Sequence, residues 1–243
     1  MHPETENQNG LPPVIDTTPE SEQFYESTNY PTETLTAETI TELAANFAGE
    51  KVAVIDLDGT VADSMVPFCE ALNEHFQSEA GVDLDYQPEH NVSFNILDTL
   101  TRKYPDLNHS FTPETVYGIF DNPQVFIDAK PLYAAATLVK ALKDVGYKII
   151  YATSRPEHVH GIVEATQKWL STYDMPVDYL FFENQRTTGT SKADLIAALA
   201  PVVAEGSIFY DDKPQTLAET EKALKSLQSA AMPTNIFVGS CED

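Results

Sequence analysis

Five short apolar runs, separated by helical patterns, constrain the fold more than any other feature of this 243-residue chain. The runs span residues 51–56, 147–153, 178–182, 207–211 and 235–239. In the segments between them, apolar residues recur at helical spacing over residues 132–144, 156–170, 192–204 and 214–227. Apolar strands that alternate with amphipathic helices are typical of a buried parallel sheet. The sequence therefore predicts an α/β fold, with a Rossmann-like parallel sheet flanked by helices.

The connection between the first two strands is too long for an ordinary crossover. Residues 63–128 contain one clear helical pattern, followed by a polar, aromatic-rich remainder with no evident strand pairs. We interpret this segment as a small, mainly helical insertion, called the cap below, above the carboxyl end of the first strand. The α/β core would then comprise residues 36–62 and 129–243.

Charge and cysteine content restrict the classes of function and the location. The formal net charge is -24, and residues 1–50 hold ten acidic and no basic residues, so residues 1–35 are predicted to form an acidic, disordered tail. A surface that binds polynucleotide needs clustered Lys and Arg, and the charge argues against one. There is no apolar run of the roughly 18 to 20 residues that span a bilayer, no secretory pattern at the start, and only two cysteines. These features predict a cytoplasmic protein with no membrane partner, and they leave its oligomeric state open.

Polar side chains follow three of the predicted strands at the point where each strand ends. They are Asp56 and Asp58 after the first strand, Thr153, Ser154 and Arg155 after the second, and Asp211 and Asp212 after the fourth. Ligands of open α/β sheets bind outside the carboxyl ends of the strands. We therefore expect these residues, up to about 150 positions apart in sequence, to converge on one edge of the sheet.

Four carboxylates in one cleft require protons or a cation. Two like charges about 4 Å apart repel by roughly 4 kcal/mol at an effective dielectric constant near 20. Oxygen ligands without Cys or His favour Mg²⁺, which commonly also binds a substrate phosphate. Lys192 supports a phosphate site, because a capping-box pattern from Ser191 to Asp194 places it in a first helical turn, where a cation opposes the helix dipole. A bound phosphate would account for this placement.

These residues together resemble the motifs of the haloacid dehalogenase (HAD) superfamily of phosphotransferases. The first motif reads DLDGTV from Asp56, the second is Thr153 in IIYATSR, the third is Lys192, and the fourth is Asp211 with Asp212 in IFYDDKP. The resemblance covers roughly residues 51–240 and implies a HAD-like core. The insertion is similar to the C1-type cap of that superfamily.

The resemblance implies a chemical role for each motif. Asp56 would be the nucleophile that forms an aspartyl-phosphate, and Asp58 would protonate the leaving alcohol and then activate water. Thr153 and Lys192 would hold phosphoryl oxygens. Mg²⁺ would be bound by the Asp56 carboxylate, the Asp58 main-chain carbonyl and Asp211, with help from Asp212. The predicted substrate contacts are Gly59, Thr60, Ser154, Arg155 and Arg186.

The substrate is less constrained by the sequence. The run KPLYAAATLVKALKDVGYKIIYATSRP is similar to the 5'(3')-deoxyribonucleotidase group, whereas FFENQRTTGTSKADLI resembles the 3'-phosphatase domain of phage-type polynucleotide kinases. The acidic surface and the cap favour a small phosphorylated partner, such as a nucleoside monophosphate, over a polynucleotide. A non-catalytic module that binds a phosphorylated ligand on the same fold is a further alternative, although both Asp56 and Asp58 are present.

Overall fold

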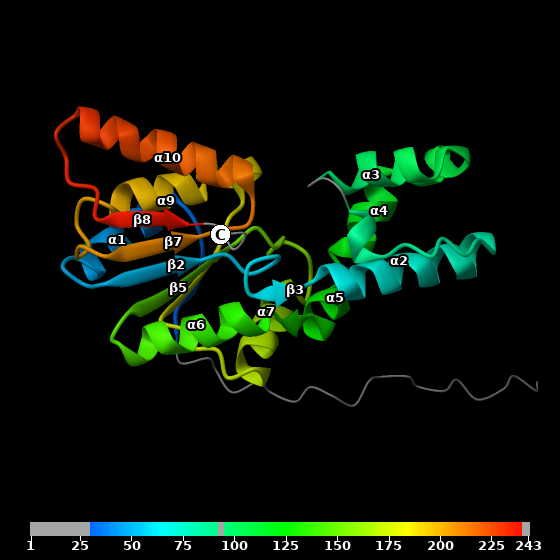
Figure 1. Cartoon of the computed structure of the whole chain (residues 1–243), viewed down its shortest axis with the longest axis horizontal. Helices are drawn as coiled ribbons and strands as arrows, with labels where there is room; N and C mark the ends of the chain where they lie inside the picture. The colour runs from blue at the N-terminus through cyan, green and yellow to red at the C-terminus, as the bar shows by residue number, and fades with distance from the viewer. Residues whose placement is uncertain (1–29, 92–94, 240–243) are drawn as a thin grey trace, which may run out of the picture.

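The computed structural model describes residues 30–91 and 95–239, apart from the side chains of residues 185 and 186. Within these residues, six parallel strands form one sheet in the order β1-β6-β5-β2-β7-β8 (Figure 1). The strands are β1 (Thr32–Thr34), β2 (Val52–Ile55), β5 (Lys148–Thr153), β6 (Tyr179–Phe182), β7 (Ser207–Tyr210) and β8 (Ile236–Gly239). The predicted fold class, a parallel α/β sheet flanked by helices, is confirmed.

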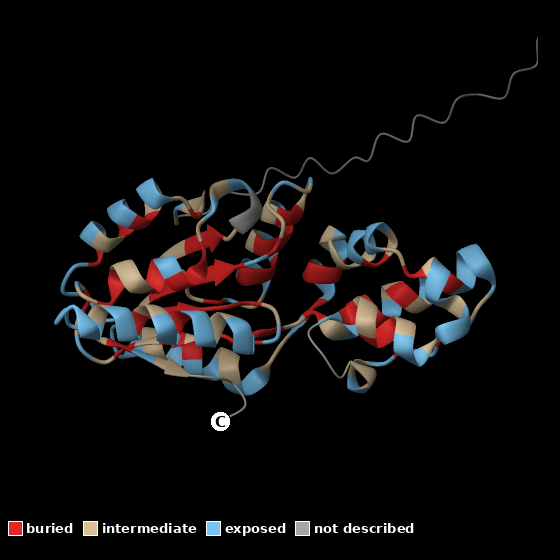
Figure 2. Ribbon diagram, turned by 90° about the horizontal axis from the view of Figure 1, so that it is seen from above, coloured by how far each residue is buried: buried red, intermediate tan, exposed pale blue. Residues whose placement is uncertain are grey.

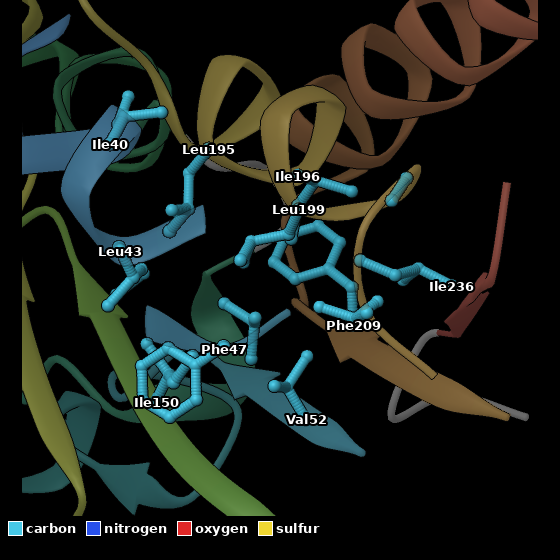
Figure 3. Packing of buried hydrophobic residues seen from close by; sticks show 14 of the residues in the cluster. Ile40, Leu43, Phe47, Val52, Ile150, Leu195, Ile196, Leu199, Phe209 and Ile236 are labelled. Carbon is cyan, nitrogen blue, oxygen red and sulfur yellow. The ribbon is translucent and has the colours of Figure 1, made fainter. Parts of the chain in front are cut away.

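Helices cover both faces of the sheet (Figure 1). One face carries α1 (Ala37–Asn46), α9 (Lys192–Leu199) and α10 (Pro214–Ser229), and the other carries α6 (Tyr133–Asp144) and α7 (Ile162–Thr172). Successive side chains of a strand point to opposite faces. Val52, which Figure 3 shows, and Val54 accordingly pack in the first cluster, whereas Ala53 and Ile55 pack in the second. Because β2 is buried on both faces, it is a rigid support for the residues that follow it.

The cap contains helices and has its own apolar core, set apart from the sheet (Figures 1 and 2). Its helices are α2 (Met65–Ala80), α3 (Ile96–Lys103), α4 (Pro113–Phe120) and α5 (Pro123–Asp128), with 3-10 turns at Pro88–His90 and Pro105–Ser110. Two short antiparallel strands, β3 (Ala62–Asp63) and β4 (Lys130–Pro131), pair where the chain leaves the core and returns to it. The two connections between core and cap therefore lie side by side.

Some boundaries differ from the sequence predictions. The predicted tail, residues 1–35, overlaps β1, which pairs with β6 and is followed by the fully buried Leu35; residues 1–29 lie outside the described residues. A three-residue edge strand is too short to give a periodic pattern. Helix α7 begins at Ile162 because Gly161 before it has a φ of +87°, and α9 ends at Leu199, just before Pro201. No helix in the described ranges has both the length and the apolar character needed to cross a membrane.

Candidate active site

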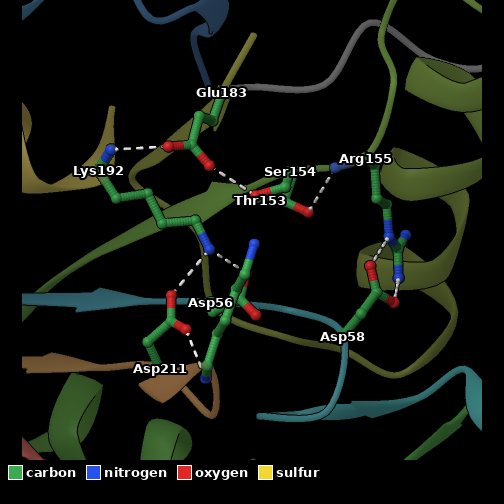
Figure 4. Close-up of polar contacts among 9 residues, drawn as sticks. Asp56, Asp58, Thr153, Ser154, Arg155, Glu183, Lys192 and Asp211 are labelled. Carbon is green, nitrogen blue, oxygen red and sulfur yellow. Dashed lines mark hydrogen bonds and ion pairs between the residues drawn. The ribbon is translucent and has the colours of Figure 1, made fainter. Parts of the chain in front are cut away.

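A buried lysine joins two carboxylates at the carboxyl edge of the sheet (Figure 4). Asp56 directly follows β2, Asp211 directly follows β7, and Lys192 is the first residue of α9. The Lys192 Nζ donates hydrogen bonds to Asp56 Oδ1 at 2.6 Å and to Asp211 Oδ2 at 2.9 Å. All three residues are at most 6% exposed. The structure thus brings together Asp56 and Asp211, which follow two strands, and Lys192, which begins a helix and lies 136 positions from Asp56 in sequence.

Burial and charge shape the proton affinities of this cluster. Burial raises the pKa of Asp56 to about 7, and the neighbouring Asp211 adds to this effect, although Lys192 opposes it. Burial alone would lower the pKa of Lys192, but the carboxylates of Asp56 and Asp211 outweigh burial, so its pKa is raised above the usual range. Burial, and then Asp211, raise the pKa of Asp212 to about 6. Lys192 therefore stays charged and is outnumbered by carboxylates.

The carboxylates fit a hard cation. One oxygen from each of Asp56, Asp211 and Asp212 lies within 4.8 Å of the others. Three carboxylate oxygens, with no thiolate or imidazole among them, are the donor set that suits Mg²⁺. Gly59 makes room for this arrangement: its φ is +81°, and a Cβ at this position would lie 2.1 Å from Asp212 Oδ2. Three of the predicted metal ligands, Asp56, Asp211 and Asp212, thus lie together. The fourth, the main-chain carbonyl of Asp58, stays a prediction.

The second aspartate of the motif has a different partner. Asp58 accepts two hydrogen bonds from Arg155, from Nε to Oδ2 and from one terminal nitrogen to Oδ1, both at 2.8 Å (Figure 4). The Arg155 side chain is completely buried. In this structure the guanidinium group is paired with a protein carboxylate, and the predicted contact of Arg155 with the substrate stays a prediction.

Glu183, which we did not predict, connects two of the predicted site residues. It follows the last residue of β6 and accepts hydrogen bonds from the Ser154 hydroxyl at 2.6 Å and from the Lys192 main-chain nitrogen at 3.0 Å. It thereby fixes the start of α9, in addition to the capping box formed by Ser191 and Asp194. The signal was available, because Glu183 is the polar residue that ends the third predicted strand.

The remaining predicted residues fall in different places. Gly59, Ser154, Arg155 and Lys192 line a pocket of about 480 Å³ with the three clustered carboxylates. Thr60 instead lines a second pocket, beneath α6, and its predicted contact with the substrate stays a prediction. Thr153 is buried at the end of β5, and its hydroxyl accepts a hydrogen bond from the Arg155 main-chain nitrogen at 3.3 Å. The side chain of Arg186 lies outside the described residues.

The cap supplies the other wall of this pocket. The cap residues that line it are Asp63, Ser64, Met65, Asn91, Ile96, Phe120 and Asp121. This wall combines three large apolar side chains with polar groups, whereas the core wall is mostly charged. The pocket thus has a charged end on the sheet and a mixed, partly apolar end on the cap, within the size range of small-molecule sites.

Comparisons with known proteins support the fold. A model of the PITM 1-3 LNS2 domain matches residues 106–209, less than half of the chain and without either aspartate of the first motif. A candidate phosphatase from Clostridium difficile superposes with a TM-score of 0.52 at 15% identity, covering 80% of this chain and 96% of that one. This likeness shows a shared α/β fold. No curated protein sequence matches the chain.

Two further solved structures are similar at a lower level. A haloacid dehalogenase-like family hydrolase from Streptococcus pneumoniae has a TM-score of 0.49 at 16% identity, covering 72% of this chain and 81% of that one. A chain of the Pnkp1/Rnl/Hen1 RNA repair complex has a TM-score of 0.38 at 15% identity, covering 79% of this chain and 42% of that one. The solved structures similar to this chain thus include a HAD-like family hydrolase and a candidate phosphatase, and the likeness to the latter shows a shared α/β fold.

Proposed function

We propose that this chain is a Mg²⁺-dependent phosphomonoester hydrolase that acts through an aspartyl-phosphate on Asp56. One observation carries the proposal. A buried Lys192 holds the carboxylates of Asp56 and Asp211 at the carboxyl edge of the sheet, beside Asp212 and facing a pocket that the cap closes on one side. A buried excess of negative charge is costly unless it binds a cation. A site with this charge is suited to hold a metal ion and a phosphate together.

The proposed reaction assigns one task to each residue. A carboxylate oxygen of Asp56 attacks the phosphorus, the bond from phosphorus to the ester oxygen breaks, and Asp58 gives the departing alcohol its proton. Asp58 then takes a proton from a water molecule, which attacks the phosphorus and releases inorganic phosphate and free Asp56. Lys192 keeps Asp56 in place and stabilises negative charge on the phosphoryl oxygens. Mg²⁺, held by Asp56, Asp211 and Asp212, would supply further charge stabilisation.

The proposed substrate is a small phosphomonoester, with a nucleoside monophosphate as the leading class. The apolar part of the cap wall, Met65, Ile96 and Phe120, suits an organic group of the size of a base or sugar. A polynucleotide would have to approach a chain with a formal net charge of -24. The cap would therefore select a small substrate and exclude water from the reaction.

The test is phosphate release with and without Mg²⁺. The panel comprises nucleoside 5'- and 3'-monophosphates, sugar phosphates, a small aryl phosphate and a 3'-phosphorylated oligonucleotide. We expect Asp56→Asn to abolish turnover while circular dichroism stays unchanged. Asp98→Asn is the matched control, because Asp98 lies on cap helix α3, where it pairs with the exposed Arg102 at 2.9 Å.

Each outcome decides between the alternatives. Turnover of small monophosphates that needs both Mg²⁺ and Asp56 supports the proposal. Undiminished turnover by Asp56→Asn would rule out the mechanism, and preference for the oligonucleotide would replace the proposed substrate with a nucleic-acid end. If no member of the panel is hydrolysed, the chain is better described as a module that binds a phosphorylated ligand.

A further inference from the structure

We propose that Arg155 is a positioning residue: it holds the Asp58 carboxylate in its working orientation and connects that carboxylate to the base of the cap. This inference rests on the proposed function, since it concerns how the acid of that reaction is held. It assigns Arg155 a role different from the predicted contact with the substrate.

The contact between the two side chains sets the orientation of the carboxylate. Arg155 uses two nitrogens of its planar fork, and each is 2.8 Å from a different oxygen of Asp58. A bidentate pair of this kind fixes both the distance and the plane of a carboxylate, which a single contact cannot do. The Asp58 side chain is 20% exposed and lines the pocket, whereas that of Arg155 is fully buried. Both residues line the pocket, but of the two side chains only that of Asp58 is exposed.

The guanidinium group is itself held by two elements. Its third nitrogen donates a hydrogen bond at 3.1 Å to the hydroxyl of Thr166 on α7, and that hydroxyl donates to the main-chain oxygen of Ile162. The ring of Phe126 lies against the guanidinium carbon at 4.4 Å from the ring centroid. The guanidinium group of Arg155 is therefore held between Thr166 on α7 and the Phe126 ring on α5, and it has little freedom to turn toward a ligand.

Phe126 connects the guanidinium group of Arg155 to the cap. It lies on α5, the last cap helix before β4 returns the chain to the core, and it is fully buried. Its ring also contacts the ring of Phe120 edge-on, at 5.8 Å between centroids, and Phe120 lines the pocket. A continuous series of packed groups thus runs from the cap wall through Phe120, Phe126 and Arg155 to Asp58.

The role makes a specific kinetic prediction. A general acid accelerates the reaction only when it is within hydrogen-bond reach of the leaving oxygen, so a misplaced Asp58 slows the departure of a poor leaving group. An alcohol needs this proton, whereas a nitrophenolate departs without it. The value of kcat/KM reports the steps up to departure of the leaving group. The effect of Arg155 should therefore depend on the leaving group, which loss of a substrate contact would not do.

The experiment compares kcat/KM for an alkyl phosphate and for 4-nitrophenyl phosphate. We expect Arg155→Met to lower kcat/KM for the alkyl phosphate by roughly 100-fold, which is the size of a typical general-acid effect. The value for 4-nitrophenyl phosphate should fall by less than about 5-fold, because its leaving group does not need the proton. Arg155→Lys keeps the charge but not the fork and should fall between wild type and Arg155→Met. Phe126→Leu removes the ring and should show a smaller loss with the same leaving-group dependence.

Two controls separate positioning from a structural role. Arg102→Met removes an exposed cap arginine and should leave both rates unchanged. In a double-mutant cycle, Arg155→Met should add little to the loss already caused by Asp58→Asn, because both act through one group. Thermal unfolding is measured for every variant, and Phe126→Leu keeps the test available if Arg155→Met does not fold.

The outcomes distinguish this inference from the proposed function. A leaving-group-dependent loss that is not additive with Asp58→Asn supports the positioning role. Equal losses for both substrates, a rise in KM alone, additive losses, or a gain in activity would overturn it while the phosphatase function stands. If the wild-type chain hydrolyses neither substrate, the proposed function and this inference both fail.

Discussion

Replacing Lys192 by Met should destabilise the metal-free chain, because Lys192 is the only cation that contacts Asp56 and Asp211 among the described residues. Its Nζ lies 2.6 and 2.9 Å from their oxygens, and its side chain is 3% exposed. At an effective dielectric constant near 20, each contact is worth about 6 kcal/mol of attraction. Desolvation of the buried charges offsets most of this gain, so that breaking a buried pair by removing one partner costs about 3–5 kcal/mol.

Urea unfolding at pH 8 in the presence of a chelator measures this cost. We expect the free energy of unfolding of Lys192→Met to fall by about 3–5 kcal/mol. Lys225→Met is the control, because that lysine is 73% exposed and pairs with Glu221 at 3.2 Å. Exposed pairs contribute at most about 1 kcal/mol. Added Mg²⁺ should restore more stability to Lys192→Met than to wild type, since it supplies the missing positive charge.

The result that would refute this reasoning is a loss no larger than that of Lys225→Met. Such a result would mean that Asp56 and Asp211 do not form a buried charged pair with Lys192. The electrostatic argument for the site, and with it the case for a bound cation, would then be wrong.

Two further predictions concern the proposed metal site. Gly59→Ala should cost about 1–2 kcal/mol of stability because of its positive φ, and it should also weaken Mg²⁺ binding, measured by calorimetry, because the new Cβ displaces Asp212. Gly81→Ala is the control, because Gly81 has a φ of +65° and open space around it, so this variant should lose similar stability but bind Mg²⁺ as wild type does. If both variants lost Mg²⁺ affinity equally, the placement of Mg²⁺ beside Asp212 would be wrong. Second, burial raises the pKa of Asp56 from 3.8 to about 7. Between these two pH values the folded metal-free chain binds more protons than the unfolded chain. The contribution of Asp56 to stability therefore falls as the pH rises through this range. Since Mg²⁺ competes with those protons, its stabilisation in a thermal shift assay should grow from pH 5 to pH 8, and a flat profile would contradict the predicted site.

The sequence predicted the sheet well because its strands are short apolar runs with clear ends. Asp56, Asp211 and Asp212, which the rule of converging strand ends brings together, do lie close to one another, and Lys192 reaches two of them from the start of α9. The edge strand β1 was missed because Thr32–Thr34 carries no apolar pattern and pairs on one side only. Periodicity detects a stripe of buried residues, and a three-residue edge strand has too few residues to form one.

Side-chain partners were harder to predict than positions. Arg155 follows Thr153 in a loop, and from the sequence alone we predicted that it contacts the substrate. Its actual partner is 97 residues away, and the choice between Asp58 and a substrate depends on how α5 and α7 pack around the guanidinium group. That packing is a property of the tertiary structure and leaves no local signal in the sequence.

The two aspartates of the first motif therefore receive different environments although they are two residues apart. Asp56 is buried against Lys192 and Asp211, next to the oxygens that suit a metal ion, whereas Asp58 lies at the pocket wall with Arg155 behind it. Each carboxylate has its own cation, and the two cations come from different parts of the core. In the proposed reaction, Asp56 as the nucleophile would stay fixed near the metal ion, whereas Asp58 as the acid would face the leaving group. Separate partners allow the fold to meet both requirements from two positions that are separated by only one residue.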